Sequence, residues 1–263
     1  MARFCPLYSG SSGNASYVGT GSGGILVDAG VSCKSILAAL SAREIDPNQI
    51  EGVFITHEHI DHIRGLKVLL KKHRVPVYSS APTLDYLIQN DMVPPGTRLE
   101  PMEGRTVELG SLSVTAFDTP HDAAGSVGYR IETADGRKVA VATDLGHVSE
   151  TVREGITGCD LVLLEANYDP GMLRCSSYPY YLKRRIASEN GHLSNDCCAH
   201  QVEQLVKTGS TRFVLAHLSR ENNLPSLAFQ TILGALQMAG CQENRDFTLS
   251  VAPRGEPGEL VVF

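Results

Sequence analysis

Residue types that bind metals are crowded into one short segment, T-H-E-H-I-D-H, at residues 56–62. Its members His57, His59, Asp61 and His62 would repel one another if the histidines were protonated, and they would be poorly satisfied if buried without a metal. Imidazole and carboxylate are ligands that suit Zn²⁺ or Mn²⁺. The segment therefore predicts a metal site, and a solvated polar loop is the less favoured interpretation.

Three further candidate ligands each follow a predicted strand. His121 comes after SVTAFDTP, Asp144 ends KVAVATD, and His217 ends RFVLAH. Any one of them alone would more often be a capping or core residue. Together they supply a third histidine for one metal, a carboxylate that can bridge two metals, and a final histidine for the second. Asp28, which ends GILVDAG, is expected to hold the histidine-rich turn in place.

The elements that must position these residues follow from hydrophobic periodicity. The N-terminal part predicts strands at 14–20, 24–28 and 52–56 and helices at 34–42 and 60–74. The segment 98–142 is rich in strand-like runs, and ADGR at 134–137 predicts a hairpin turn. Beyond it we expect helices near 149–155, within 178–187, within 194–207 and at 225–239, and strands at 160–164, 212–216 and 247–251.

This order of elements predicts an α/β (α+β) protein. Two sheets packed face to face, each covered by helices, would account for it, although periodicity alone does not establish such a four-layer αββα sandwich. No linker, charge block or repeat divides the sequence. We therefore expect one domain over residues 1–263, without a large inserted domain.

The composition narrows the class of protein. With 42% hydrophobic and 20% charged residues, the chain resembles an ordinary soluble globular protein. A net charge of −6 excludes a generally basic protein that coats nucleic acid, but a nucleic-acid enzyme needs only a local basic rim. No apolar run suggests a membrane helix or a signal peptide. Seven scattered cysteines without a CxxC pair predict reduced thiols in a cytoplasmic protein with no membrane partner.

Taken in order, Asp28, the HxHxDH segment, His121, Asp144 and His217 resemble the five motifs of the metallo-β-lactamase superfamily. The resemblance implies an αββα sandwich with a dinuclear metal site at one edge. By that match, one ion takes His57, His59 and His121, the other takes Asp61, His62 and His217, and Asp144 bridges the two.

Several residues of this chain differ from the motifs of other branches of the superfamily, and these differences argue against membership of those branches. The di-iron redox branch has a glutamate where this chain has His59, and true β-lactamases lack a bridging aspartate such as Asp144. Only 72 residues separate Asp144 from His217. That spacing leaves no room for the inserted domain of the cleavage-factor and ribonuclease J nucleases.

Several longer segments are together similar to the YycJ (WalJ) family of bacterial proteins. They are SGSSGNASYV at 9–18, LEANYDPGML at 164–173, YPYYLKRRI at 178–186, GHLSND at 191–196 and HLSRENN at 217–223. The resemblance implies a 5′-to-3′ exonuclease on double-stranded DNA, associated with mismatch repair in some bacteria. The implied cofactors are two divalent ions, Zn²⁺ or Mn²⁺, and the implied partner is duplex DNA.

The chemistry expected of this site is phosphodiester hydrolysis. Two divalent ions about 3.5–4 Å apart lower the pKa of a shared water, and the resulting hydroxide attacks phosphorus in line. Asp61 is also expected to orient the hydroxide. His192 is the candidate general acid for the leaving 3′-oxygen, and its alternative role is that of a hydrogen-bonded loop histidine.

Candidate substrate contacts lie in three places. Ser12 and Asn14 belong to a turn of small residues whose backbone N–H groups can cradle a phosphate, and Arg184 belongs to a short basic run that can bind phosphate. A further set follows His217 closely, namely Ser219, Asn222 and Asn223. The helix at 60–74 carries five Lys or Arg residues and predicts a basic flank for a duplex. A plain turn and solvated surface residues are the alternatives.

Two other functions remain open from the residues alone. The same site suits a small-molecule phosphodiesterase or a thioester or lactone hydrolase. The other hypothesis is a regulatory protein with structural metals. The seven candidate ligands disfavour it, because structural zinc sites are usually closed and tetrahedral. The residues carry no signal for an oligomeric state.

Overall fold

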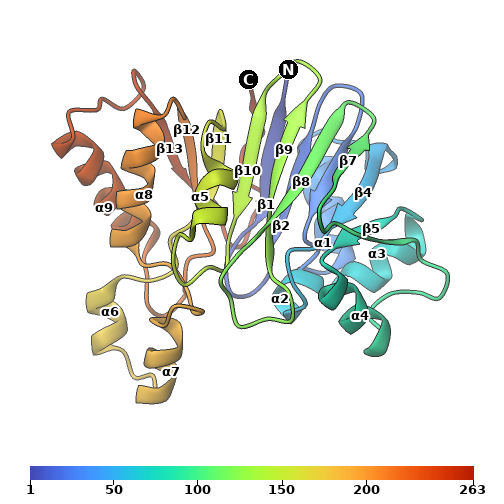
Figure 1. The fold of residues 1–263 in the computed structure, drawn as a ribbon, viewed down its shortest axis with the longest axis horizontal. Coiled ribbons are helices and arrows are strands. Elements are labelled where there is room, and N and C mark those ends of the chain that lie inside the picture. Colours follow the sequence, from blue (N-terminus) through green and yellow to red (C-terminus); the bar gives the residue numbers. More distant parts are fainter.

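The computed structural model describes residues 1–263, which form two seven-stranded sheets packed face to face (Figure 1). The first sheet has the order β14-β1-β2-β3-β4-β5-β6. Its strands are β1 (Arg3–Tyr8), β2 (Ala15–Gly19), β3 (Gly24–Val27), β4 (Ile50–Phe54), β5 (Val77–Ser79), β6 (Leu99–Pro101) and β14 (Val261–Val262). The second sheet has the order β13-β12-β11-β10-β9-β8-β7. Its strands are β7 (Thr106–Leu109), β8 (Leu112–Asp118), β9 (Val127–Thr133), β10 (Lys138–Ala142), β11 (Leu161–Glu165), β12 (Arg212–Ala216) and β13 (Thr248–Val251).

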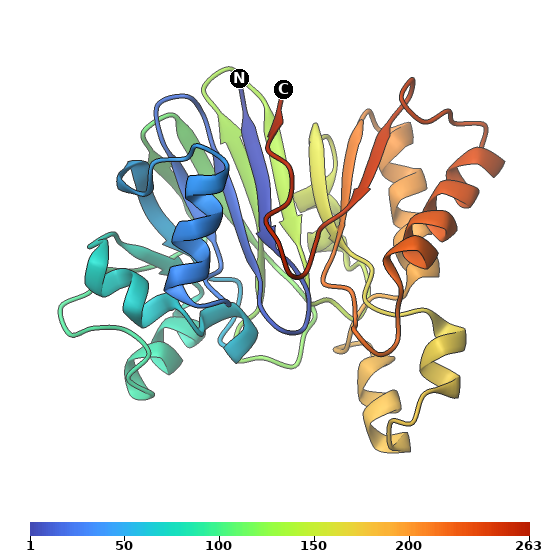
Figure 2. The same ribbon diagram turned by 180° about the vertical axis from the view of Figure 1, so that it is seen from behind.

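Helices cover the outer faces of both sheets (Figures 1 and 2). Those beside the first sheet are α1 (Cys33–Ala42), α2 (Ile60–Ile63), α3 (Leu66–Lys72) and α4 (Ala81–Gln89). Those beside the second are α5 (Glu150–Ile156), α8 (Asn195–Lys207) and α9 (Pro225–Met238). The short helices α6 (Pro170–Cys175) and α7 (Tyr180–Ile186) extend beyond the layers at one end (Figure 1). No helix combines the length and the apolar character needed to cross a membrane.

Three apolar clusters hold the four layers together. The central one lies between the sheets and includes Phe54, whose ring stacks on Tyr78 at 4.5 Å and meets Tyr129 edge-on at 5.4 Å. One outer cluster joins the first sheet to α1, α3 and α4, and the other joins the second sheet to α5, α8 and α9. The expected αββα sandwich is therefore confirmed.

Strand direction decides where side chains at strand ends gather. β3 to β6 run parallel to one another, and so do β10 to β13. The carboxyl ends of parallel strands meet at the same edge of a sheet, which is where ligands bind in open α/β sheets. Both sheets bring such ends to one edge of the sandwich, and the loops there carry the candidate ligands.

The predicted helix at 60–74 is broken in the structure. It forms α2 and α3, which are separated around Gly65. A Cβ atom at Gly65 would lie 2.1 Å from the carbonyl oxygen of Val31, and the Gly65 amide donates to the carbonyl of Ala29. Close packing on the 29–31 loop therefore overrides continuous helical periodicity.

Five strands and helices were not predicted: β1, β5, α4, α6 and β14. The start of α4 carries a recognisable signal, since the side chain of Ser80 caps the helix and a proline lies in its first turn. β14 has only two residues and pairs with β1 from the far end of the chain. Local periodicity does not reveal such a pairing.

Candidate metal centre

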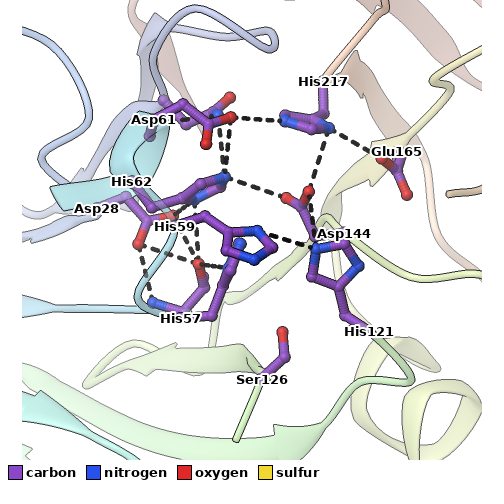
Figure 3. Close-up of polar contacts among 12 residues, drawn as sticks. Asp28, His57, His59, Asp61, His62, His121, Ser126, Asp144, Glu165 and His217 are labelled. Atoms are coloured by element: carbon purple, nitrogen blue, oxygen red, sulfur yellow. Dashed lines mark hydrogen bonds and ion pairs between the residues drawn. The ribbon is translucent and has the colours of Figure 1, made fainter. Parts of the chain in front are cut away.

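The predicted ligands converge at one edge of the sandwich (Figure 3). Each follows a strand: Asp28 follows β3, His57 to His62 follow β4, His121 follows β8, Asp144 follows β10 and His217 follows β12. The first sheet and the second sheet both contribute. Their side chains point toward a common centre in Figure 3.

The backbone is strained at three of these strand ends. The φ angle is 64° at Asp28, 58° at Asp144 and 54° at His217. Non-glycine residues seldom adopt this left-handed conformation, which costs about 1–3 kcal/mol each and concentrates at functional sites. The conformation turns the chain sharply as it leaves the strand. Positive φ angles and metal-ligating residue types therefore occur at the same edge of the sandwich.

Four overlapping groups of residues have the spacing of a metal site, and two of them, of three residues each, match the predicted ligand sets. The first is His57, His59 and His121, and the second is Asp61, His62 and His217, with the ligand atoms of each group all within 4.8 Å of one another. Nδ1 of His59 lies 3.3 Å from Nε2 of His121. In the second group, Oδ2 of Asp61 lies 3.4 Å from Nε2 of His217 and 3.7 Å from Nε2 of His62.

Asp144 lies between the two groups. Its Oδ1 is 3.7 Å from Nε2 of His121 in the first group, and its Oδ2 is 3.2 Å from Nε2 of His62 in the second. Its carboxylate is also 3.4 Å from Nδ1 of His217. Asp144 is 2% exposed, so it faces the ligands and not solvent.

Two buried polar atoms in this centre lack a hydrogen-bond partner. They are Nε2 of His57 and Oδ2 of Asp144. A buried polar group without a partner costs about 1–3 kcal/mol, yet both atoms lie among other metal-ligating atoms. Neutral imidazole nitrogens and carboxylate oxygens are the donors that a divalent cation takes. The residues present therefore fit a divalent metal.

The histidines have shifted pKa values of opposite sign. Burial and the neighbouring charge of His62 lower the pKa of His57 well below its ordinary value, which leaves it neutral. Burial also acts to lower the pKa of His62, but the charges of Asp28 and Asp144 outweigh it and raise that pKa to about 10. Although burial opposes it, the charges of His217 and His62 hold the pKa of Asp144 well below its usual range.

Asp28 contacts the back of the His62 ring. Its Oδ2 accepts a hydrogen bond from Nδ1 of His62 at 2.8 Å, and its Oδ1 accepts from the Thr56 amide at 2.8 Å. The hydroxyl of Thr56 lies 3.0 Å from Oδ2 as well. These bonds fix the ring so that its Nε2 faces the centre. Gly30 permits the close packing here, because a Cβ atom would lie 1.6 Å from the carbonyl oxygen of Asp61.

Glu165 is a member of the centre that sequence reasoning missed. It ends β11 and is fully buried. Its Oε1 lies 2.8 Å from Nδ1 of His192 and 2.9 Å from Nδ1 of His217, and its Oε2 accepts from the amides of Leu145 and Leu193. These contacts make it a residue that orients two histidines. The signal was a carboxylate at the end of DLVLLE, as Asp144 ends the preceding strand.

His192 lies beside the ligands. Its ring centroid is 5.2 Å from that of His121 and 5.4 Å from that of His217. Its side chain is 19% exposed, so one side of the ring is open to a substrate. Burial lowers its pKa, but the charge and hydrogen bond of Glu165 outweigh this effect and raise the pKa above its ordinary value.

The candidate contacts near the N-terminus differ in exposure. Asn14 is buried, with Nδ2 3.1 Å from the Gly10 carbonyl oxygen and 3.1 Å from Nε2 of His62. Asn14 therefore supports the turn and the His62 ring. Ser12 is exposed, and its carbonyl oxygen accepts from Nη1 of Arg64 at 2.9 Å.

The structure contradicts the expectation for two residues after His217. Asn222 and Asn223 are both 0% exposed and offer no surface to a substrate. Asn223 donates to the carbonyl oxygen of Ala166 at 2.8 Å and bonds to the side chain of Asn195. These bonds brace the loop that carries His217.

The last two candidate substrate contacts, Ser219 and Arg184, also differ in exposure. Ser219 is 9% exposed, and its hydroxyl accepts from the Asn222 amide at 3.1 Å. Arg184 is exposed on α7 and forms no ion pair. Its neighbour Arg185 does, to Asp122 beside His121, at 2.5 Å.

Comparison with known families agrees with this fold and donor set. The model of the beta-lactamase superfamily domain matches residues 24–218, which include every candidate ligand. The chain therefore belongs to the beta-lactamase superfamily. The family and the donor set together support binding of divalent metal.

Within the superfamily the chain groups with the YycJ and WalJ proteins. It is 37% identical over 241 residues to "Exodeoxyribonuclease YycJ" of Bacillus anthracis, with 90% of each chain covered. It is 34% identical over 252 residues to "Exodeoxyribonuclease WalJ" of Streptococcus pneumoniae, with 93% of this chain and 92% of that protein covered.

Solved structures share the fold at low sequence identity. The metallo-beta-lactamase fold protein YhfI from Bacillus subtilis superposes with a TM-score of 0.71 at 16% identity, over 99% of this chain and 98% of that one. Zn²⁺-bound PqqB from Methylobacterium extorquens gives 0.72 at 18% identity over the whole of both chains. These likenesses establish the metallo-β-lactamase fold.

Proposed function

We propose that this protein is a metal-dependent exonuclease that hydrolyses duplex DNA from the 5′ end with two divalent ions, Zn²⁺ or Mn²⁺. The observation that carries the proposal is the pair of ligand groups joined by Asp144, in a chain similar to proteins named exodeoxyribonucleases. One ion would be held by His57, His59 and His121 and the other by Asp61, His62 and His217, with Asp144 shared. When bound, such a pair supplies a nucleophile at neutral pH and neutralises charge on the phosphate.

His192 is the residue we assign to the leaving group. Its Nδ1 is held by Glu165 at 2.8 Å, so its Nε2 is free to give a proton to the departing 3′-oxygen. The raised pKa favours the protonated ring, which is the state a general acid needs. Asp61 contributes through its second oxygen, which can accept a hydrogen bond from the attacking water.

A duplex substrate is supported by the surface beside α3. Lys71 and Arg74 are exposed and form no ion pair, and with Arg98 they line a hollow of about 660 Å³. This hollow lies where α3 ends and β5 and β6 begin, at the opposite edge of the sheet from the metal centre, so a substrate that contacts both must be long. Cations in such a place bind phosphates of a backbone without regard to sequence. Ser12 and Arg184, both exposed, are proposed as contacts nearer the scissile bond.

Two further proposals concern the domain organisation of the chain and the location of the protein. Both sheets contribute ligands to the same centre, which supports a single domain over residues 1–263. All seven cysteines are free thiols, which supports a cytoplasmic location, where thiols stay reduced.

The test uses protein loaded separately with Mn²⁺ and with Zn²⁺, and its metal content is measured by mass spectrometry. Duplex DNA with a 5′-phosphate and a 3′-label is supplied beside single-stranded DNA and bis(4-nitrophenyl) phosphate. Progressive shortening from the 5′ end, lost in His59→Ala and retained in the surface control His200→Ala, is the expected result. Turnover of the small ester alone would overturn the nuclease proposal and leave a small phosphodiesterase.

A further inference from the structure

The loop at residues 9–14, which joins β1 to β2, lies against two ligand-bearing segments. The amide of Asn14 donates to the carbonyl oxygen of Asp61 at 2.8 Å, and the hydroxyl of Ser9 accepts from the amide of His217 at 2.8 Å. Ser11 and Ser12 at the tip of the loop are exposed. The loop therefore forms part of the rim of the metal centre.

A segment from the C-terminal part of the chain lies beside this loop. Figure 2 shows the chain between β13 and β14 descending next to the loop that joins β1 to β2. The Ser9 amide donates to the carbonyl oxygen of Pro253 at 3.0 Å. The next residue, Arg254, donates from Nη2 to the carbonyl oxygen of Ser219 at 2.6 Å. Arg254 thus bridges the loop and the segment two residues beyond His217.

Gly10 allows Arg254 to come this close. The φ angle of Gly10 is 138°, and a Cβ atom there would lie 3.3 Å from Cγ of Arg254. The stem of Arg254 therefore packs directly on the loop backbone. A larger residue at position 10 would be strained and would press on the arginine.

Two arginines contact the loop, a third follows the segment that one of them binds, and none has a carboxylate partner. Arg64 donates to the carbonyl oxygen of Ser12, Arg254 to that of Ser219, and Arg220 is exposed directly after Ser219. None of them is among the arginines that form ion pairs. Burial and the like charge of Arg220 lower the pKa of Arg254.

Arg254 also has an unused hydrogen-bond donor. Its Nε is buried and has no partner. Arg43, which binds the same C-terminal segment, uses both Nε and Nη2 on carbonyl oxygens of Gly258 and Pro257. Because Nε is buried, an anion can be met only by the outer nitrogens of this partly buried guanidinium, and the cationic neighbour Arg220 favours an anion there.

We propose that Arg254, together with Arg220, Arg64 and the exposed hydroxyls of Ser11 and Ser12, forms a phosphate-binding subsite next to the metal centre. The inference rests on the proposed nuclease function and names the part of the substrate that this rim holds, a phosphate group of the strand beside the scissile bond. A guanidinium fork binds phosphate through two charge-assisted hydrogen bonds. The phosphate is either the terminal 5′-monophosphate or an internal diester, which have the same recognition chemistry.

The test compares Arg254→Met and Arg254→Lys with Arg245→Met as the matched control. Arg245 lies in the loop after α9, where its side chain donates to Gln242 and Asp246. For each variant kcat and KM are measured on a 5′-phosphorylated duplex, the same duplex with a 5′-hydroxyl, and bis(4-nitrophenyl) phosphate. Melting temperatures and metal contents are measured in parallel.

The expected result is a loss of about tenfold in kcat/KM of Arg254→Met on DNA, mainly through KM, as for loss of a charge-assisted hydrogen bond. The loss of kcat/KM on the small ester is at least fivefold smaller. Arg254→Lys recovers part of the activity on DNA because it keeps the charge. The control Arg245→Met matches the wild type. A loss confined to the phosphorylated duplex assigns the terminal phosphate, and an equal loss on both duplexes assigns an internal one.

Two outcomes would overturn the inference. If kcat/KM of Arg254→Met on DNA equals that of the wild type, no phosphate is bound at Arg254. If the losses on DNA and on the small ester are equal, Arg254 only supports the fold of the rim. Failure of the nuclease proposal is seen separately, as absence of DNA cleavage by the wild type. In that case Kd for the duplex is measured in the His59→Ala background, with and without Arg254→Met. A Kd about tenfold weaker with Arg254→Met supports the subsite, and an unchanged Kd contradicts it.

Discussion

The buried carboxylate of Glu165 accepts a hydrogen bond from Nδ1 of His192 at 2.8 Å. The other oxygen of Glu165 is held by two backbone amides, so the carboxylate has one orientation. His192 is thereby fixed with one nitrogen on an anion and the other directed away from it. This arrangement fits a histidine that delivers a proton. His62 and His217 have the same carboxylate support at Nδ1, but their Nε2 atoms lie near Asp61 among the candidate ligands.

Substrates with different leaving groups test the role of His192. We expect His192→Ala to lower kcat on duplex DNA about 100-fold or more, since general acid catalysis contributes about 10²–10⁴-fold. The loss on bis(4-nitrophenyl) phosphate is expected to be much smaller, because nitrophenolate leaves without a proton. Steady-state kinetics on both substrates, with His200→Ala as control, provide the measurement. Equal losses on both substrates would show that His192 acts on the metals or on the fold instead.

Asp28 is expected to tune metal affinity without touching the metal. In Asp28→Asn the shape is kept, but His62 loses the anion that binds its Nδ1 at 2.8 Å. Loss of such a partner typically costs 10–100-fold in metal affinity or activity, so we expect a weakening of about that size. Competition with a chromogenic chelator measures it, and Asp46→Asn, an exposed residue that caps the turn at Pro47–Gln49 before β4, serves as control. An unchanged affinity would mean that Thr56 alone orients the ring.

Metal uptake is expected to release protons. In the metal-free protein the pKa of His62 is raised to about 10, so the ring is protonated at neutral pH and must lose its proton to bind metal. The sign follows: affinity rises as pH increases from 7 toward 10, and it falls at lower pH. The same raised pKa stabilises the metal-free fold below about pH 6.5, and this contribution is lost as pH rises through about 10.

Calorimetry in buffers of different ionisation enthalpy measures that proton release. Titrations with Zn²⁺ at pH 8 should show net release of at least one proton for each protein, and less in Asp28→Asn, whose His62 loses a neighbouring anion. Heats that do not depend on the buffer would contradict a protonated His62 in the metal-free state.

The sequence was informative about the centre because ligand chemistry is local. The HxHxDH segment and the strand-end residues His121, Asp144 and His217 could be selected from type and position alone, and the structure places them together. Glu165 was overlooked because its one signal, a carboxylate at the end of an apolar strand, does not by itself separate a functional residue from a structural one. Only the fold brings it against histidines from two other segments.

Burial was the property that the sequence did not reveal. Asn222 and Asn223 follow His217 as closely as a substrate contact would, yet both are fully buried. A polar residue near a ligand can face the substrate or brace the loop, and the difference depends on long-range contacts such as that to Asn195. Arg254 shows the converse, since it lies 37 residues after His217 in a segment without motifs, yet it reaches the carbonyl of Ser219.

Gly30 provides a test of how tightly the two ligand-bearing segments are packed. A methyl group there would lie 1.6 Å from the carbonyl oxygen of Asp61, so Gly30→Ala must push the start of α2 away. We expect a lower melting temperature and a metal affinity reduced at least tenfold. Gly234→Ala in α9, where nothing lies within 4 Å, is the matched control. It is expected to stabilise the protein by about 0.5–1 kcal/mol. Normal metal affinity in Gly30→Ala would show that the position of Asp61 does not depend on this contact.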